Sequence, residues 1–315
     1  MTHPEGPLLL ALDQGTTSSR AIVFDRTGRP LASAWQAHRQ SYPQPGWVEH
    51  DPEEILDAQV RSLREAVARS GVDPRSIAAV GLTNQRETVV VWDRDTGAPI
   101  HPAIVWQCRR TAPAVETLLA RNLSARIAEK TGLVPDAYFS GTKIAWILDH
   151  VPGARRRAEE GGLAAGTIDS WLLFRLTGGR VHATDPSNAS RTLLYNFLEH
   201  RWDPELCGMM DVPLSMLPEV RPSSGRFGDL DPSILGVPVP VAGMAGDQQA
   251  ALFGQACFEA GRVKNTYGTG CFLLSPTGRA PVRSRNGLLA TVAWDLGDGP
   301  HYALEGSVFN AGSAI

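Results

Sequence analysis

The residues best suited to chemistry in this sequence lie in a polar loop between two apolar runs, 8–12 and 21–24. The loop contains Asp13, Gln14, Gly15, Thr16, Thr17, Ser18, Ser19 and Arg20. Hydroxyl and backbone N–H groups in such a turn can bind an anion, and an arginine adds a planar donor for phosphate oxygens. Asp13, at the end of the first apolar run, could hold hydrated Mg²⁺. An ordinary hairpin with a polar turn is an equally good interpretation of this segment alone.

A second segment, 261–275, follows the same plan. It predicts a strand over 263–266, a turn over 268–270 and a returning strand over 271–274. Two such hairpins predict a duplicated architecture, in which two loops could hold a polyphosphate from both sides of a cleft. The sequence contains no GxxxxGK[ST] motif, so the Walker type of nucleotide site is excluded.

Between the hairpins, the hydrophobic pattern predicts alternating strands and helices. A helix is expected between an Asp51 cap and Gly71, because Pro52 suits its first position and apolar residues recur at helical spacing. Other helices are expected over 110–121, 124–130 and 142–150, and strands over 77–82, 88–92, 103–106 and 239–243. Because open α/β folds bind ligands beyond the carboxyl ends of strands, the polar residues found there are candidate site residues.

These candidates also have simpler interpretations. Arg86 and Glu87 could form a surface ion pair, because adjacent charges are frequent. Trp106 could be a core tryptophan, and Tyr138 an ordinary loop aromatic. Asp247 could serve only as the N-cap of the helix that follows it.

Three further segments have no predicted role in chemistry. Residues 185–196 are expected to form a polar turn that leads into an apolar patch. Residues 221–239 are rich in proline, glycine and serine, and are expected to form a loop or linker. Asp169 or Ser170 is expected to cap a helix that ends near residue 177.

Composition argues against several classes of protein. Hydrophobic residues make up 43% of the 315 positions, enough for a sizeable core, and a net charge of −3 does not suit a nucleic-acid surface. The four cysteines form no CxxC pair and the eight histidines no HExxH motif, so we expect neither a disulfide framework nor a zinc site. No stretch reads as a signal peptide or a membrane span, and we expect a cytoplasmic protein with no nucleic-acid partner.

Seven motifs, spread in order along nearly the whole chain, together resemble the glycerol kinases of the FGGY carbohydrate kinase family: DQGTTSSR, GLTNQRET, AIVWQCRRT, GTIDSWLLFRLTGG, AGDQQAALFGQ, KNTYGTGCF and LEGSVF. The resemblance implies an α/β fold of the actin-like (ribonuclease H-like) ATPase class. It also implies an N-terminal, glycerol-binding domain over 1–253 and the beginning of a C-terminal, nucleotide-binding domain over 254–315. The chain would then be a truncated, N-terminal portion of such a kinase.

The implied activity is the ATP-dependent phosphorylation of glycerol to sn-glycerol 3-phosphate, by a cytoplasmic kinase that is a homo-oligomer when full length. Asp247 matches the catalytic base, and Asp13 matches the residue that positions Mg²⁺, so ATP and Mg²⁺ are the expected cofactors. The residues that match glycerol contacts are Arg86, Glu87, Trp106, Tyr138, Asp247, Gln248 and Phe272. Those that match phosphate or nucleotide contacts are Thr16, Thr17, Ser18, Arg20, Gly268, Thr269 and Gly312.

Two other functions fit the same motifs. The chain could be a related FGGY sugar kinase that acts on a pentulose or a gluconate-type acid, or a nonenzymatic fragment that binds polyol. Some glycerol kinases of this family are inhibited by fructose 1,6-bisphosphate, bound at a glycine-rich run followed by arginine. The interval 221–244 lacks that run and adds Asp229 and Asp231. We therefore expect no inhibition, since only Arg221 and Arg226 could supply cations.

Overall fold

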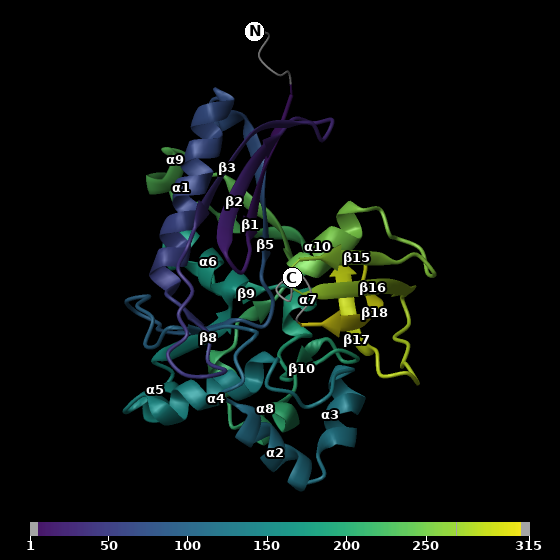
Figure 1. Ribbon diagram of the computed structural model, residues 1–315. Helices are drawn as coiled ribbons and strands as arrows, with labels where there is room; N and C mark the ends of the chain where they lie inside the picture. The colour runs from purple at the N-terminus through teal and green to yellow at the C-terminus, as the bar shows by residue number, and fades with distance from the viewer. Residues whose placement is uncertain (1–5, 269, 310–315) are drawn as a thin grey trace.

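The computed structural model describes residues 6–268 and 270–309, and a six-stranded sheet, here called the central sheet, occupies its upper half as drawn in Figure 1. The strand order is β13-β14-β5-β1-β2-β3. In chain order the strands are β1 (Leu8–Gln14), β2 (Ser18–Phe24), β3 (Pro30–Ala37), β5 (Ile77–Asn84), β13 (Ser224–Asp229) and β14 (Pro240–Gly246). β1, β5 and β14 run parallel, and their last residues pair in register: Gln14 with Asn84, and Asn84 with Gly246. The loops that follow these three strands therefore meet at one edge of the sheet.

A long helix, α1 (Pro52–Ser70), packs on β2 and β3. The side chain of Asp51 accepts a hydrogen bond from the backbone N–H of Glu53, and Gly71 ends the helix in the left-handed conformation. This confirms the predicted cap, start and end of the helix. Helix α6 (Ile168–Leu176) contacts β5, and the short helix α9 (Pro232–Leu235) lies beside α1 (Figure 1).

A second, four-stranded sheet has the order β4-β7-β6-β8. Its strands are β4 (Glu49–His50), β6 (Val89–Asp93), β7 (Ala103–Ile104) and β8 (Leu163–Thr167). Around it lie the helices at the bottom of Figure 1: α2 (Ala112–Ala120), α3 (Ser124–Thr131), α4 (Ser140–His150), α5 (Ala154–Glu159) and α8 (Pro204–Met210). The shorter elements are η1 (Pro74–Ser76), α7 (Pro186–Ala189), η2 (Leu214–Met216) and the strand pairs β9 (Ala183–Thr184) with β12 (Glu219–Val220) and β10 (Tyr195–Asn196) with β11 (Arg201–Trp202).

The last part of the chain forms an antiparallel sheet of order β15-β16-β18-β17, drawn in yellow-green and yellow in Figure 1. Its strands are β15 (Lys264–Tyr267), β16 (Cys271–Gly278), β17 (Leu289–Asp295) and β18 (Pro300–Val308). Helix α10 (Asp247–Gly254) connects β14 to this sheet. Both predicted hairpins are present, because β1 pairs with β2 and β15 pairs with β16 in antiparallel fashion. Among the residues described, no helix has both the length and the apolar character needed to cross a membrane.

Three local predictions were wrong. Residues 221–239 are not a simple loop, because they contain β13, which pairs with β14 at the edge of the central sheet, and α9. Asp169 and Ser170 cap no helix: Thr167 occupies the N-cap position of α6, and both side chains are fully buried. Asp247 is the first residue of α10, and the N-cap position belongs to Gly246. For residues 221–239, the pairing of β13 with β14 gives a regular structure to a segment whose composition alone favours a loop.

Gly132, which ends α3, supports a stability prediction. Its φ is +73°, and an added Cβ would lie 2.5 Å from the carbonyl oxygen of Ala290 on β17. Gly71 has a similar φ of +68°, but a Cβ there would meet nothing within 4 Å. We expect Gly132→Ala to lower the free energy of unfolding by about 1–3 kcal/mol more than Gly71→Ala, because overpacking is added to the same backbone strain. Denaturant unfolding of both variants measures the difference, and equal losses would contradict the expectation.

Candidate active site

A pocket of about 170 Å³ lies beside the loops that follow β1 and β5 and the start of α10. It is lined by Thr16, Arg86, Glu87, Trp106, Tyr138, Asp247, Gln248, Thr266, Gly268, Gly270 and Phe272. All seven residues predicted to contact glycerol are among them. A wider groove of about 790 Å³, lined by residues 39–42, 49–54 and 99–102, brings together none of the predicted site residues.

The turn after β5 directs Arg86 and Glu87 into the pocket. Glu87 has a φ of +61°, a left-handed conformation that is uncommon for residues other than glycine. Its backbone carbonyl accepts a hydrogen bond from Oγ of Ser140 at 3.0 Å. Arg86 and Glu87 are only 3% and 1% exposed, so the interpretation of this pair as surface charges is wrong.

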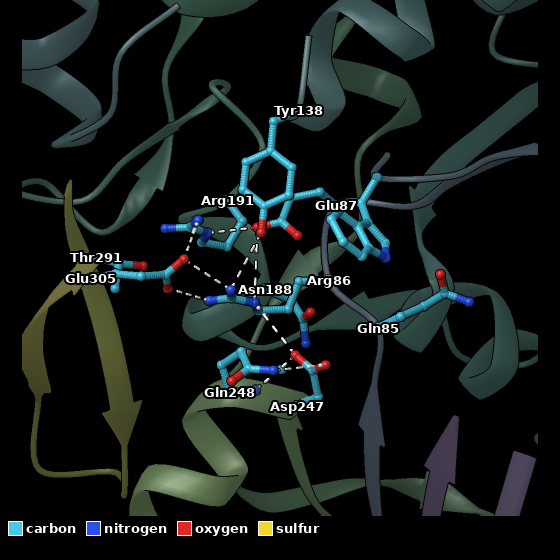
Figure 2. A network of polar contacts seen from close by, with 12 residues as sticks. Gln85, Arg86, Glu87, Tyr138, Asn188, Arg191, Asp247, Gln248, Thr291 and Glu305 are labelled. Carbon is cyan, nitrogen blue, oxygen red and sulfur yellow. Dashed lines mark hydrogen bonds and ion pairs between the residues drawn. The ribbon is translucent and has the colours of Figure 1, made fainter. Parts of the chain in front are cut away.

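Arg86 lies at the centre of the polar contacts in the pocket (Figure 2). Its guanidinium donates two hydrogen bonds to Glu305, at 2.6 and 3.0 Å, and a longer one to the hydroxyl of Tyr138, at 3.4 Å. Its Nε lies 3.5 Å from Oδ1 of Asp247. An added Cβ on Gly246 would lie 2.7 Å from Cγ and Cδ of Arg86. Glycine at the end of β14 is therefore what allows Arg86 and Asp247 to approach each other.

Glu87 is held by a second, fully buried arginine. Nε of Arg191 donates a hydrogen bond to Oε1 of Glu87 at 2.8 Å, and Nη2 donates another to Glu305 at 2.9 Å. Burial raises the pKa of Glu87, although Arg86 and Arg191 oppose this shift. The two arginines thus favour the carboxylate form of a side chain that burial would otherwise protonate more readily.

Asp247 places a carboxylate at the wall of the pocket. Its Oδ1 accepts a hydrogen bond from the backbone N–H of Gln248 at 2.7 Å, and 34% of its side chain is exposed. Desolvation of the carboxylate by the surrounding protein nevertheless raises the pKa of Asp247; Arg86 opposes this shift, and the nearby Asp13 adds to it. A carboxylate with a raised pKa in a pocket has the properties of a general base.

Three aromatic rings line the pocket together. The ring centroid of Trp106 lies 5.9 Å from that of Tyr138 and 5.8 Å from that of Phe272, both in T-shaped arrangements. Nε1 of Trp106 also donates a hydrogen bond to Oγ1 of Thr16 at 3.0 Å. Rings of this kind pack against the CH groups of a ligand, while the polar side chains fix its hydroxyls.

The residues predicted to bind phosphate are brought together only in part. Thr16 and Gly268 line the pocket from the two different hairpins. Thr269 and Gly312 lie outside the described residues. On the β1–β2 hairpin, but not among the residues that line the pocket, lie Asp13, Thr17, Ser18 and Arg20.

Carboxylates near the pocket are the candidate ligands for a divalent cation. Within residues 6–268 and 270–309, no group of three or more His, Cys, Asp or Glu side chains is placed to hold a metal. Asp13 is half-buried and pairs across the hairpin with Arg20; burial raises the pKa of Asp13, while Arg20 lowers it. Asp13 and Asp247 are close enough to interact electrostatically. One or two carboxylates are what Mg²⁺ requires of a protein when phosphates and water supply its other ligands.

Three residues of the site were not predicted from the sequence. Arg191 and Glu305 complete the buried contacts of Arg86 and Glu87. Lys143 is fully buried, and its ammonium donates hydrogen bonds to the backbone carbonyls of residues 137–139. These hydrogen bonds hold the turn that carries Tyr138. The only sequence signal for Glu305 was its place in the LEGSVF motif.

Comparison with known proteins shows the family to which the chain belongs. Residues 8–254 match the N-terminal domain of the FGGY family of carbohydrate kinases. The chain belongs to this family. A glycerol kinase from Symbiobacterium thermophilum is 60% identical to this FGGY chain over 307 residues, which make up 98% of the chain and 62% of the relative. The chain therefore spans 62% of the length of that relative.

Solved structures confirm the fold of this FGGY chain. Glycerol kinase from Plasmodium falciparum, solved with ADP, superimposes with a TM-score of 0.92 at 37% identity, over 98% of the chain and 62% of that structure. Xylulose kinase from Rhodospirillum rubrum has the same fold. It superimposes with a TM-score of 0.86 at 24% identity, over 98% of the chain and 62% of that structure. The α/β, actin-like ATPase fold predicted from the sequence is confirmed.

Proposed function

We propose that the protein to which this chain belongs is a glycerol kinase, which transfers the γ-phosphoryl group of ATP to a terminal hydroxyl and yields sn-glycerol 3-phosphate. The observation that carries the proposal is the convergence of Arg86, Glu87, Tyr138 and Asp247 on one small pocket with an aromatic lining. The 60% identity to a glycerol kinase supports the same activity. The ADP in the related Plasmodium structure supports ATP as the donor.

In this proposal some side chains orient glycerol and another accepts its proton. Arg86 donates to a glycerol hydroxyl and Glu87 accepts from one, so the triol is held in one orientation. Trp106 and Phe272 cover its CH groups. Asp247 accepts the proton of the attacking hydroxyl, and the raised pKa of Asp247 makes it a better proton acceptor than an ordinary aspartate.

The phosphate side of the proposed site is formed by the loops of the two hairpins. Thr16 and Gly268 line the pocket, and Thr17, Ser18, Arg20, Thr269 and Gly312 are proposed to contact the nucleotide. Asp13 would hold Mg²⁺ through water, and that ion would neutralise charge on the transferred phosphoryl group. We also propose that residues 1–253 are the glycerol-binding domain, that 254–315 begin the nucleotide-binding domain, and that the enzyme is a cytoplasmic homo-oligomer.

A substrate panel tests this proposal. The full-length product of the gene is assayed with ATP and Mg²⁺ against glycerol, xylulose and gluconate, with release of ADP as the readout. We expect the highest kcat/KM for glycerol. A preference for xylulose or gluconate would show a related sugar kinase instead, and binding of glycerol without turnover would show a nonenzymatic polyol-binding protein.

The structure also supports the expectation that fructose 1,6-bisphosphate does not inhibit the enzyme. Both cations of the interval 221–244 already have partners: Arg226 lies 2.6 Å from Asp229, and Arg221 contacts Glu219 at 2.5 Å. Initial rates with and without millimolar bisphosphate should therefore be equal. Strong inhibition that disappears in Arg226→Ala would show that this chain binds the bisphosphate through different residues.

A further inference from the structure

Glu305 contacts both arginines of the buried network but does not line the pocket. It lies on β18 and is fully buried. Its carboxylate accepts two hydrogen bonds from Arg86, at 2.6 and 3.0 Å, and one from Arg191, at 2.9 Å. The hydroxyl of Ser307 adds a fourth, at 3.0 Å. Figure 2 shows Glu305 on one side of Arg86 and Asp247 on the other.

The formal charges of this network cancel. Arg86 and Arg191 contribute two positive charges, and Glu87 and Glu305 two negative ones. Asp247, 3.5 Å from Arg86, and the nearby Lys264 add one charge of each sign, so the balance is kept. Burial opposes the ionised form of Glu305, but Arg191 and Arg86 outweigh it and lower the pKa of Glu305 to about 2. Glu305 is therefore ionised at neutral pH, and its negative charge balances a positive charge beside the pocket.

Two buried guanidinium groups beside a small pocket would otherwise favour an anion. Arginine binds carboxylates through paired, charge-assisted hydrogen bonds, and these are stronger inside a protein than in water. Without the charge of Glu305, the network would carry a net charge of +1 next to the ligand. A carboxylate on the ligand could then take the place of the missing charge.

We propose that Glu305 is a specificity-determining residue, which makes the pocket select an uncharged polyol and reject the corresponding acid. This inference rests on the proposed function, because it assigns a substrate class to the same pocket. Glu305 acts through Arg86 and need not touch the substrate itself. This role of Glu305 would also explain why the pocket binds glycerol and not a sugar acid of the gluconate type.

The test compares glycerol with glycerate, the acid in which a carboxylate replaces one terminal CH₂OH group. Binding of each ligand to the full-length gene product is measured by calorimetry, in the wild type and in Glu305→Gln. Glutamine keeps the shape and one acceptor oxygen but removes the charge. We expect the variant to bind glycerate about 10- to 100-fold more tightly than the wild type does, and glycerol no more tightly, as a charge-assisted contact implies.

A matched control is Glu49→Gln, because Glu49 is also paired with an arginine, Arg110 at 2.7 Å, but lies outside the pocket. The control should leave the affinities for glycerol and glycerate unchanged. Arg191→Gln combined with Glu305→Gln restores a neutral network, and we expect it to reject glycerate again. A merely structural role for Glu305 would weaken glycerol and glycerate together in the single variant, and that result would overturn the proposal.

The wild-type protein provides a measurement that does not depend on the folding of any variant. Glycerate in tenfold excess should not displace glycerol from it, and equal affinity for the two ligands would overturn the proposal. The proposed function fails separately, if the wild type does not bind glycerol. A wild type that binds glycerol, with a folded Glu305→Gln that gains no affinity for glycerate, would refute the role of Glu305 alone.

Discussion

Replacing Asp247 with asparagine is expected to lower kcat by about 10²–10⁴-fold, the range typical of a lost general base, while glycerol still binds. The amide has nearly the same shape as the carboxylate and can still accept the hydrogen bond from the backbone N–H of Gln248. What it cannot do is take a proton from the attacking hydroxyl. The full-length gene product is used for both the rate measurement and glycerol calorimetry.

The pH dependence adds a second signature of this role. Because the pKa of Asp247 is raised, the wild-type rate should begin to fall, as the pH is lowered, at a higher pH than an ordinary aspartate would give. The rate of Asp247→Asn should not show this fall, because asparagine does not titrate. Asp51→Asn is the matched control, since Asp51 stands before helix α1 and asparagine caps a helix equally well. Turnover of Asp247→Asn within tenfold of the wild type would refute the assignment of the base.

Local signals predicted the elements that carry the site, but not how those elements align. The strands β1, β5 and β14 and the helix α1 follow from apolar runs, caps and proline positions that each occupy a few neighbouring residues. The register that aligns Gln14, Asn84 and Gly246 pairs residues up to 162 positions apart, and no local pattern encodes it. The resemblance to a known family, and not the spacing, placed Arg86 and Asp247 in one site.

The buried pair Arg86–Glu87 shows why the residues alone gave the wrong answer. Adjacent opposite charges are usually exposed, because burying them costs more than their attraction returns unless other groups compensate. Here the compensation comes from Arg191 and Glu305, which are distant in sequence. Burial of an ion pair is thus a property of the assembled network, and a motif of two residues does not carry it.

The loop between β1 and β2 shows a different limit, because only one of the side chains predicted there to contact phosphate lines the pocket. Side chains alternate between the two faces of a strand, and β2 begins at Ser18. Consequently Ser19 is buried while Arg20 is exposed, and of the residues in this loop only Thr16 reaches the pocket. Composition identified the loop, but it could not decide which of its side chains face the pocket.

Replacing Glu87 with glutamine is expected to change the affinity for glycerol, whereas Asp247→Asn is expected to change the rate. Glu87 is proposed to accept a hydrogen bond from a glycerol hydroxyl as a carboxylate, and hydrogen bonds to charged groups contribute about 1.5–3 kcal/mol. We therefore expect the Kd for glycerol to rise by about 10- to 100-fold, with a much smaller change in kcat at saturating glycerol. Calorimetry gives the Kd directly, and steady-state kinetics separates KM from kcat.

The raised pKa of Glu87 gives this prediction a direction in pH. Since the carboxylate is the form that accepts strongly, wild-type affinity for glycerol should fall as the pH is lowered through that raised pKa, whereas the affinity of Glu87→Gln should not follow this titration. Glu49→Gln again serves as the control, because Glu49 pairs with Arg110 outside the pocket. If Glu87→Gln binds glycerol as tightly as the wild type, Glu87 does not contact the substrate, and its contact with Arg191 serves only to hold the buried network together.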